Sequence, residues 1–139
     1  MMENFNGAKS GFKIDNVILT ESNFKRISNA IFDDKVQNKM EINVGVGVKD
    51  NSITVEETVR LKQIRENIEQ YSFNVKMVGL FKHIGDSEIS DMNQFGKVNG
   101  AAIIFPYIRE YITNISQKAG IGVVILPPVN FIELGKEKK

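Results

Sequence analysis

The chain has 139 residues, 42% of them hydrophobic, and contains no cysteine. A chain of this length forms one domain that buries roughly two-thirds of the surface its unfolded form exposes, and the lack of cysteine excludes a disulfide framework, a thiolate zinc site and a catalytic cysteine. Eighteen Lys and Arg against seventeen Asp and Glu residues give a formal net charge of +1, which argues against a nucleic-acid partner. No segment has the apolar length of a signal peptide or a membrane span, so we expect a cytoplasmic protein without membrane insertion.

The first element expected is a strand over 12–19, because this segment is rich in β-branched and apolar residues. We expect a bulge or bend near Asn16 and a strand that changes sides midway. The reason is that strict alternation splits its apolar side chains into two pairs on opposite faces: Phe12 and Ile14, then Val17 and Leu19.

Three further strands are expected in succession. The segment 40–48 alternates without error between apolar and small or polar residues, which predicts a half-buried strand. Turn residues at 49–52 lead into a strand over 53–64 whose charges are expected to face solvent. The segment 71–77 alternates again, and Gly79 then breaks the period, which predicts a bulge. Short links between these strands predict an antiparallel meander with one covered face.

A helix is expected to cover that face. Lys118 and Gly120 provide a last-turn cation and a terminating glycine. An apolar stripe at helical spacing spans about 120° of a helical wheel and consists of Ala101, Ile104, Phe105, Ile108, Tyr111, Ile112, Ile115 and Ala119.

Two features of this helix leave alternatives open. Pro106 either starts the helix in its first turn or kinks a helix that begins near Asn99. Ile103 and Tyr107 point away from the stripe, so they are either incidental surface side chains or a contact with another subunit.

The apolar segment after the helix contains Pro127 and Pro128, which exclude both a helix and a central strand there. We therefore expect an irregular apolar loop across the surface, and an exposed apolar patch of this size usually marks a binding surface.

Several of these segments resemble the SecB protein-export chaperones. The signature lies in "NGAAIIFPYIREYITNISQKAG" at 99–120, followed by "PVNF" at 128–131. Supporting matches are "FKIDNV" at 12–17, "VGLFKHIG" at 78–85, and Met92 in the link to the helix. Two such motifs in the right order beside a matching strand pattern are fairly specific. The resemblance runs from about Gly11 to Leu134.

The resemblance implies an α+β fold, in which a four-stranded antiparallel sheet is covered by one long helix and followed by a short C-terminal segment. It assigns residues 11–134 to one SecB-like domain; the polar residues 1–10 before it are expected to be disordered, and residues 135–139 form a charged tail. It also implies a homotetramer, a dimer of dimers whose long helices meet in the middle. Ile103 and Tyr107 would then form the oligomer interface.

The function implied is that of an ATP-independent holdase, which binds unfolded precursor polypeptides through apolar grooves and serves protein export. The alternative is a dedicated SecB-like chaperone of a single partner such as an antitoxin. The client breadth decides between them. The candidate client-binding residues are Phe12, Ile14, Phe24, Ile31, Phe32, Phe105, Val124, Ile125, Leu126, Val129 and Phe131, although each taken alone is more often a core residue.

The export motor SecA is a possible further partner under this resemblance, because acidic side chains near the end of the first strand help family members to dock it. Glu21 stands near one such position, but Lys25 occupies the other. The tail "GKEKK" has a net charge of +2 before the terminal carboxylate, which would repel a basic motor tail. We therefore expect weak or no SecA binding unless Glu56 and Glu57, otherwise read as a solvated patch, have taken over the docking.

An enzyme is the least favoured class, and we expect no cofactor and no metal. His83 is the only histidine, so no two-histidine metal site exists. The stretches "GAKSG" and "GVGVKD" lack the spacing of phosphate-binding loops.

Overall fold

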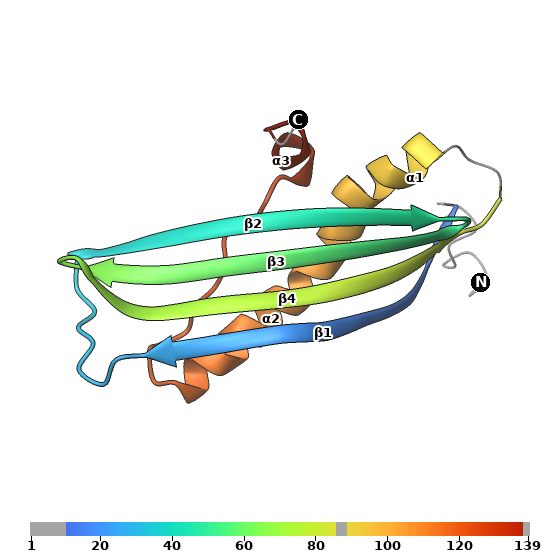
Figure 1. The fold of residues 1–139 in the computed structure, drawn as a ribbon. Coiled ribbons are helices and arrows are strands. Elements are labelled where there is room, and N and C mark those ends of the chain that lie inside the picture. The colour runs from blue at the N-terminus through green and yellow to red at the C-terminus, as the bar shows by residue number, and fades with distance from the viewer. Residues whose placement is uncertain (1–10, 86–88, 138–139) are drawn as a thin grey trace, which may run out of the picture.

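The computed structural model describes residues 11–85 and 89–137, and the expected disorder of residues 1–10 lies outside them. The elements in chain order are β1 (Phe12–Arg26), β2 (Val36–Lys49), β3 (Ser52–Arg65), β4 (Ile68–His83), α1 (Ile89–Phe95), a π-helical turn (Gly96–Gly100), α2 (Ala101–Lys118) and α3 (Phe131–Glu137). The predicted α+β architecture is confirmed (Figure 1).

The sheet has the order β1-β4-β3-β2, and each neighbouring pair is antiparallel. The predicted meander of β2, β3 and β4 is confirmed, while β1 pairs with β4 and forms one edge (Figure 1). Glu66 and Asn67 join β3 to β4 with positive φ values of 51° and 66°. Positive φ at both central residues gives a hairpin turn whose twist matches that of the strands.

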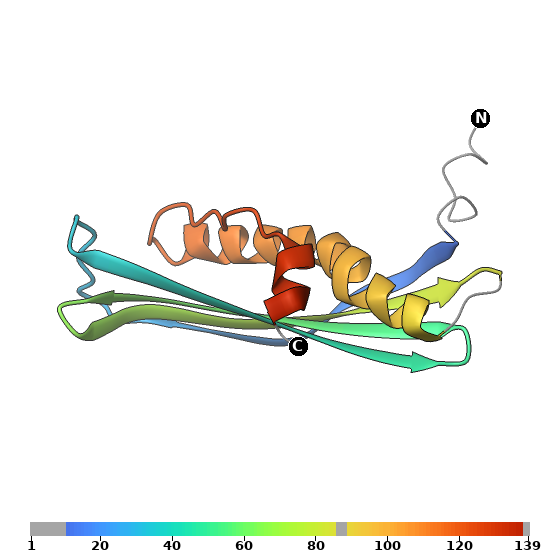
Figure 2. The ribbon, with the colours of Figure 1, turned by 90° about the horizontal axis from the view of Figure 1, so that it is seen from above.

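The described helices all lie on one face of the sheet (Figure 2). We call the opposite side, which they leave open, the outer face. Alternate side chains of β3 and β4 meet α2 in the core, which includes Ile53, Val55, Val59, Leu61, Phe73, Val75 and Phe81 from the strands and Ala101, Ile104, Phe105, Ile108 and Ile112 from α2. Within the described part of the chain, no helix is long and apolar enough to cross a membrane.

The expected irregularity near Asn16 is present, but β1 does not change sides. Its pairing with β4 shifts between Ile14 and Asn16 and again between Leu19 and Glu21. At each shift β1 contains one extra residue that has no partner in β4. The extra residue restores the next apolar side chain of β1 to the helix-facing side, which strict alternation would have placed on the outer face. As a result, helix-facing residues of β4 pair with the whole set Phe12, Ile14, Val17, Leu19, Ser22, Phe24 and Arg26.

The expectation that every charge on β3 faces solvent is wrong for Glu57. Its side chain is fully buried on the helix-facing side, between the cross-strand neighbours Val44 and Met77. Neither carboxylate oxygen has a hydrogen-bond partner within the described residues. Burial raises the pKa of Glu57 to about 8, because the charged form loses its hydration.

The bulge predicted at Gly79 is also wrong, because the pairing of β4 with both neighbours runs through this residue without a shift. The glycine serves the helix contact instead. A Cβ atom there would lie 2.8 Å from Cδ1 of Ile104 and 2.8 Å from Cε2 of Phe81. The missing side chain therefore lets α2 pack closely on the sheet.

The predicted stripe of α2 faces the core, and the structure adds Ser116 to its buried residues. Gly120 ends the helix with φ of +69°, as predicted. Of the two readings of Pro106, the structure supports the one in which the helix starts near Asn99, because α2 begins at Ala101 and the proline lies inside it. The helix start at Pro106 itself is excluded, and α1 with a π-helical turn precedes α2. The π-helical turn that joins α1 to α2 is a second irregularity, which the apolar period does not reveal.

The segment 121–130 is irregular, as the two prolines require, and α3 follows it. Asn130 caps this short helix, since its Oδ1 accepts hydrogen bonds from the backbone N–H groups of Ile132 and Glu133, each at 3.1 Å. The helix takes in the first residues of the predicted charged tail.

Candidate functional site

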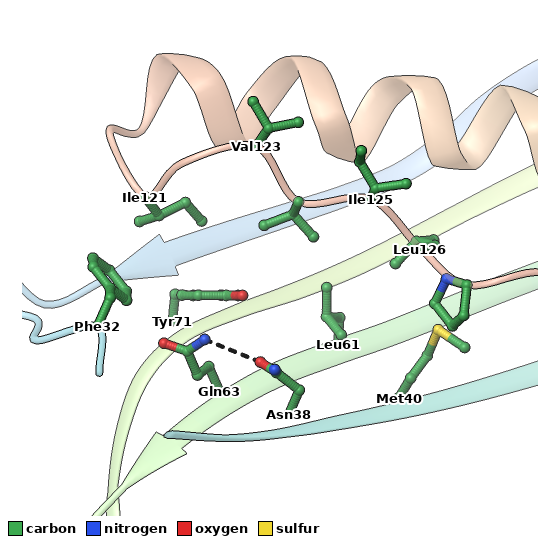
Figure 3. Close-up of a pocket in the computed structure, with 12 residues that line it drawn as sticks. Phe32, Asn38, Met40, Leu61, Gln63, Tyr71, Ile121, Val123, Ile125 and Leu126 are labelled. Carbon is green, nitrogen blue, oxygen red and sulfur yellow. Dashed lines mark hydrogen bonds between the residues drawn. The ribbon is translucent and has the colours of Figure 1, made fainter. Parts of the chain in front are cut away.

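An open groove of about 470 Å³ lies on the helix-facing side of the sheet, between the irregular segment 121–127 and the start of β4. We call it the apolar groove. Its lining comprises Phe32, Asn38, Met40, Leu61, Gln63, Tyr71, Ile121, Val123, Val124, Ile125, Leu126 and Pro127 (Figure 3). β2, β3 and β4 form its floor, and the loop segment and Phe32 stand at its sides (Figure 3).

The loop wall of the groove is fixed to α2 through the backbone of Val124. The carbonyl oxygen of Val124 accepts a hydrogen bond from Oγ1 of Thr113 at 2.7 Å, and its N–H donates to Oγ of Ser116 at 3.1 Å. The Ser116 hydroxyl in turn donates to the carbonyl of Thr113 at 2.7 Å. These bonds account for the burial of Ser116 and hold an apolar segment beside the helix without burying all its side chains.

The fixed backbone leaves two apolar side chains in solvent. Val123 is 57% exposed and Ile125 is 72% exposed, whereas Leu126 is buried at 2%. Figure 3 shows Leu126 turned toward the sheet, with Val123 and Ile125 on the other side of the loop segment. Ile125 also lines a second, shallower hollow of about 350 Å³ along α2, so apolar surface continues from the groove onto the helix.

Phe32, which stands at the far side of the groove, lies in a loop anchored on both sides. The side chain of Gln70 accepts a hydrogen bond from the N–H of Ile31 at 2.7 Å and donates to its carbonyl at 2.8 Å. Asp33 accepts two hydrogen bonds from Arg65, at 2.9 and 2.7 Å. The loop therefore presents Phe32, which is 46% exposed, from a fixed backbone.

The second anchor is charged over the whole neutral range. The hydrogen bond from Arg65 holds the pKa of Asp33 at about 2, below its usual value. At any pH from 4 to 9, the pKa values of both partners lie about two units or more away from the pH, so Asp33 and Arg65 both stay ionised.

Amide side chains form the polar part of the floor. Gln70 also donates to Oε1 of Gln63 at 3.1 Å, and Gln63 donates to Oδ1 of Asn38 at 3.0 Å. Tyr71 is buried beside them, and burial raises the pKa of its hydroxyl. Among the described residues that form the floor of the groove, none carries an ionised group, which suits an apolar ligand.

Four of the predicted client-binding residues line this groove: Phe32, Val124, Ile125 and Leu126. Ile31 is 51% exposed in the anchored loop next to Phe32. Ile14 is 45% exposed but lies toward the other end of the sheet, and Val129 is half-buried against the core.

The remaining candidates pack against other aromatic rings, with Phe12 and Phe24 partly buried and Phe105 and Phe131 in the core. Phe12 stacks on Phe95 with ring centroids 3.8 Å apart, and Phe24 packs on Phe73 at 4.6 Å. Phe105 and Phe131 are buried at 4% and 6% and contact one another, with centroids 5.7 Å apart. Phe105 and Phe131 are core residues and offer a client no surface in this structure, which corrects the expectation that these two side chains bind clients.

Sequence reasoning missed most of the floor. Met40, Leu61 and Tyr71 belong to regular alternating strands, so the pattern assigned them to the core face without showing that α2 leaves that end of the sheet uncovered. Val123, in the loop wall, was also not named, but the sequence could have revealed it, because it belongs to the same apolar run as the candidates that were named.

The residues expected at an oligomer interface differ in exposure. Tyr107 is 51% exposed on α2, whereas Ile103 is half-buried and packs partly against the core.

The residues expected to dock the motor SecA also differ in exposure. Glu21 and Glu56 are exposed on the outer face, with Glu21 paired to Lys76 at 3.9 Å. Glu57 cannot contribute, because it is buried on the other face.

Comparison with known families gives one model match, described as preprotein translocase subunit SecB, over residues 6–139. A protein-export protein SecB from Aromatoleum aromaticum is 28% identical over 145 residues, covering 96% of this chain and 87% of its own. The SecB of Orientia tsutsugamushi strain Boryong is 27% identical over 72% of this chain and 62% of its own length. An uncharacterised protein from Methanocaldococcus jannaschii is 42% identical over 57 residues, which is 41% of this chain and 36% of that protein. The matched region thus spans less than two-thirds of the last two relatives.

Two solved structures share the fold. A SecB-like chaperone from Mycobacterium tuberculosis, in complex with a peptide from the HigA1 antitoxin, superimposes with a TM-score of 0.73 at 14% identity, covering 87% of this chain and 93% of its own. A protein of unknown function from Streptococcus agalactiae gives a TM-score of 0.54 at 11% identity, covering 84% and 97%.

Proposed function

The chain belongs to the SecB family, and from this membership we propose that it is a holdase, an ATP-independent chaperone that binds unfolded polypeptide segments in the apolar groove. The observation that carries the proposal is the set of exposed apolar side chains Phe32, Val123 and Ile125 around an open groove whose backbone is anchored. Unfolded clients expose side chains of the same kind. Each one that becomes fully buried contributes about 1.5 to 3 kcal/mol.

The anchors favour binding over simple collapse. A loop that was free to move would fold its apolar side chains onto the sheet, but the hydrogen bonds to Val124 and Ile31 hold the two walls apart. Preorganised walls lower the entropy that binding must overcome. Because apolar area supplies the affinity, the groove is expected to accept many sequences.

Such a holdase is proposed to act as a homotetramer, a dimer of dimers. The support in this chain is Tyr107, a large side chain half exposed on α2 with no polar partner among the residues described. Aromatic residues are enriched at protein interfaces.

The second candidate function is a dedicated chaperone of one partner. It is favoured by the similarity in fold to the mycobacterial chaperone that was solved with an antitoxin peptide. Aggregation assays with a panel of unrelated, chemically unfolded proteins distinguish the two. A holdase protects several members of the panel, whereas a dedicated chaperone protects none of them. Protection of none, together with no bound partner peptide, would contradict both functions.

For the export motor SecA we propose weak or absent binding at about 0.15 M salt. Lys25 is exposed on the outer face near Glu21, so the two side chains present opposite charges to a motor docking there. Titration calorimetry with the SecA of the same organism tests this. Tight binding that weakens steeply with salt would overturn it and would point to Glu21 and Glu56 as the docking charges.

A further inference from the structure

The outer face carries a row of lysines at the end of the sheet that bears the apolar groove. The strand register places Lys25 of β1, Ser72 of β4, Lys62 of β3 and Lys39 of β2 side by side across all four strands. Cross-strand partners project from the same face of a sheet. The row therefore spans three strand spacings, or about 14 Å.

This arrangement is unfavourable for the sheet by itself. Lys39 and Lys62 are directly opposite one another, and like charges in that position destabilise a sheet. Within the described residues, neither of them nor Lys25 takes part in an ion pair. Their charges are therefore available to a ligand.

The row also lines a hollow of about 440 Å³. Arg60 adds a fourth cation, and the carboxylates of Glu41 and Glu69 are also present. Glu41 is already paired with Arg60 at 3.9 Å. The hollow thus combines three unpaired lysines with a concave surface, which raises the local concentration of anionic ligands.

We propose that this hollow binds an acidic segment of a partner polypeptide. Nucleic acid fits less well, because evenly spaced phosphates would also approach Glu41 and Glu69, whereas a polypeptide can place its carboxylates opposite the lysines alone. The helices lie on the other face (Figure 2). A partner docked in the hollow therefore leaves the apolar groove open, and the inference does not depend on the function proposed for that groove.

The test measures fluorescence anisotropy of a labelled, glutamate-rich peptide added to the full chain. Lys39→Glu gives Lys62 an opposite charge across the strands, so the fold is expected to be kept, and peptide binding is expected to weaken about tenfold. Lys49→Glu is the matched control, since it makes the same charge change on the same face of β2 but outside the hollow. It is expected to change the affinity by less than about twofold.

A thermal melt of each variant checks that the fold is retained. Binding should also weaken as salt is raised, because exposed charges are screened. Equal losses in the two variants would overturn the proposal, since they would reflect net charge alone. No binding of the peptide, or tighter binding of a single-stranded oligonucleotide of equal charge, would overturn it as well.

Discussion

Gln70 holds the backbone of Ile31 at both polar groups, accepting from its N–H at 2.7 Å and donating to its carbonyl at 2.8 Å. The side-chain amide of Gln70 thus makes the two hydrogen bonds that the backbone of a neighbouring strand would make, to a loop residue 39 positions away in the sequence. With Arg65 on Asp33, it fixes the position of Phe32 over the groove.

The first prediction follows from this contact. Gln70→Ala should weaken the binding of an unfolded client by about 1 kcal/mol, or about fivefold in Kd, because Phe32 loses its fixed backbone. Amide hydrogen exchange at Ile31 should become faster. Gln70→Glu keeps the acceptor for the Ile31 N–H but loses the donor, so it should give an intermediate affinity.

Gln37→Ala, an exposed glutamine of β2 outside the groove, is the control and should leave binding unchanged. Faster exchange at Ile31 with unaltered client affinity would show that the loop anchor does not matter for binding.

The second prediction concerns the buried carboxyl of Glu57. Its native pKa of about 8 lies above its ordinary value of 4.5, so between these two values the folded state binds more protons than the unfolded state. The free energy of unfolding therefore falls as pH rises through this window, by on the order of 1 kcal/mol per pH unit. Glu57→Gln should remove this slope and stabilise the protein most above pH 8.

Urea denaturation at pH 6 and pH 8.5, at one protein concentration, measures the difference. Glu56→Gln alters the neighbouring residue on the exposed outer face and should leave the slope in place. A Glu57→Gln variant with the same pH dependence as the parent chain would mean that the carboxylate has a partner when ionised.

The third prediction concerns assembly. Tyr107→Glu should convert the proposed tetramer to dimers with an intact sheet, because a charge at a buried interface is costly. Light scattering gives the mass, and circular dichroism reports the sheet. Tyr107→Phe keeps the ring and should remain tetrameric. A parent chain that is monomeric at micromolar concentration would rule out this assembly.

The regular elements could be predicted because each has a clear period. The alternation of 40–48 and the helical stripe from Ala101 to Ala119 each leave only one face for the core, and the structure places both there. β1 was harder. Its two bulges add a residue each, so a face assigned by counting fails after Ile14, although the disturbance itself was visible near Asn16.

Glu57 and Gly79 show a different limit. Both are unusual residues for their places in the strands, and each was explained by the commonest local cause, solvation for a carboxylate and a bulge for a glycine. The real causes are tertiary contacts, namely burial beneath the helices and the close approach of Ile104. The groove walls could be named from the apolar loop, but its floor depends on where α2 ends over the sheet, which no local pattern contains.

The affinity of the full chain for an unfolded, fluorescently labelled client, measured for Ile125→Asp beside Ile84→Asp, tests the central claim most directly. Both isoleucines are exposed, at 72% and 45%, but Ile84 follows β4 at the end of the sheet away from the groove. If the groove binds clients by apolar burial, Ile125→Asp weakens binding about tenfold or more and Ile84→Asp leaves it within about twofold. Equal affinity in the two variants would contradict the account.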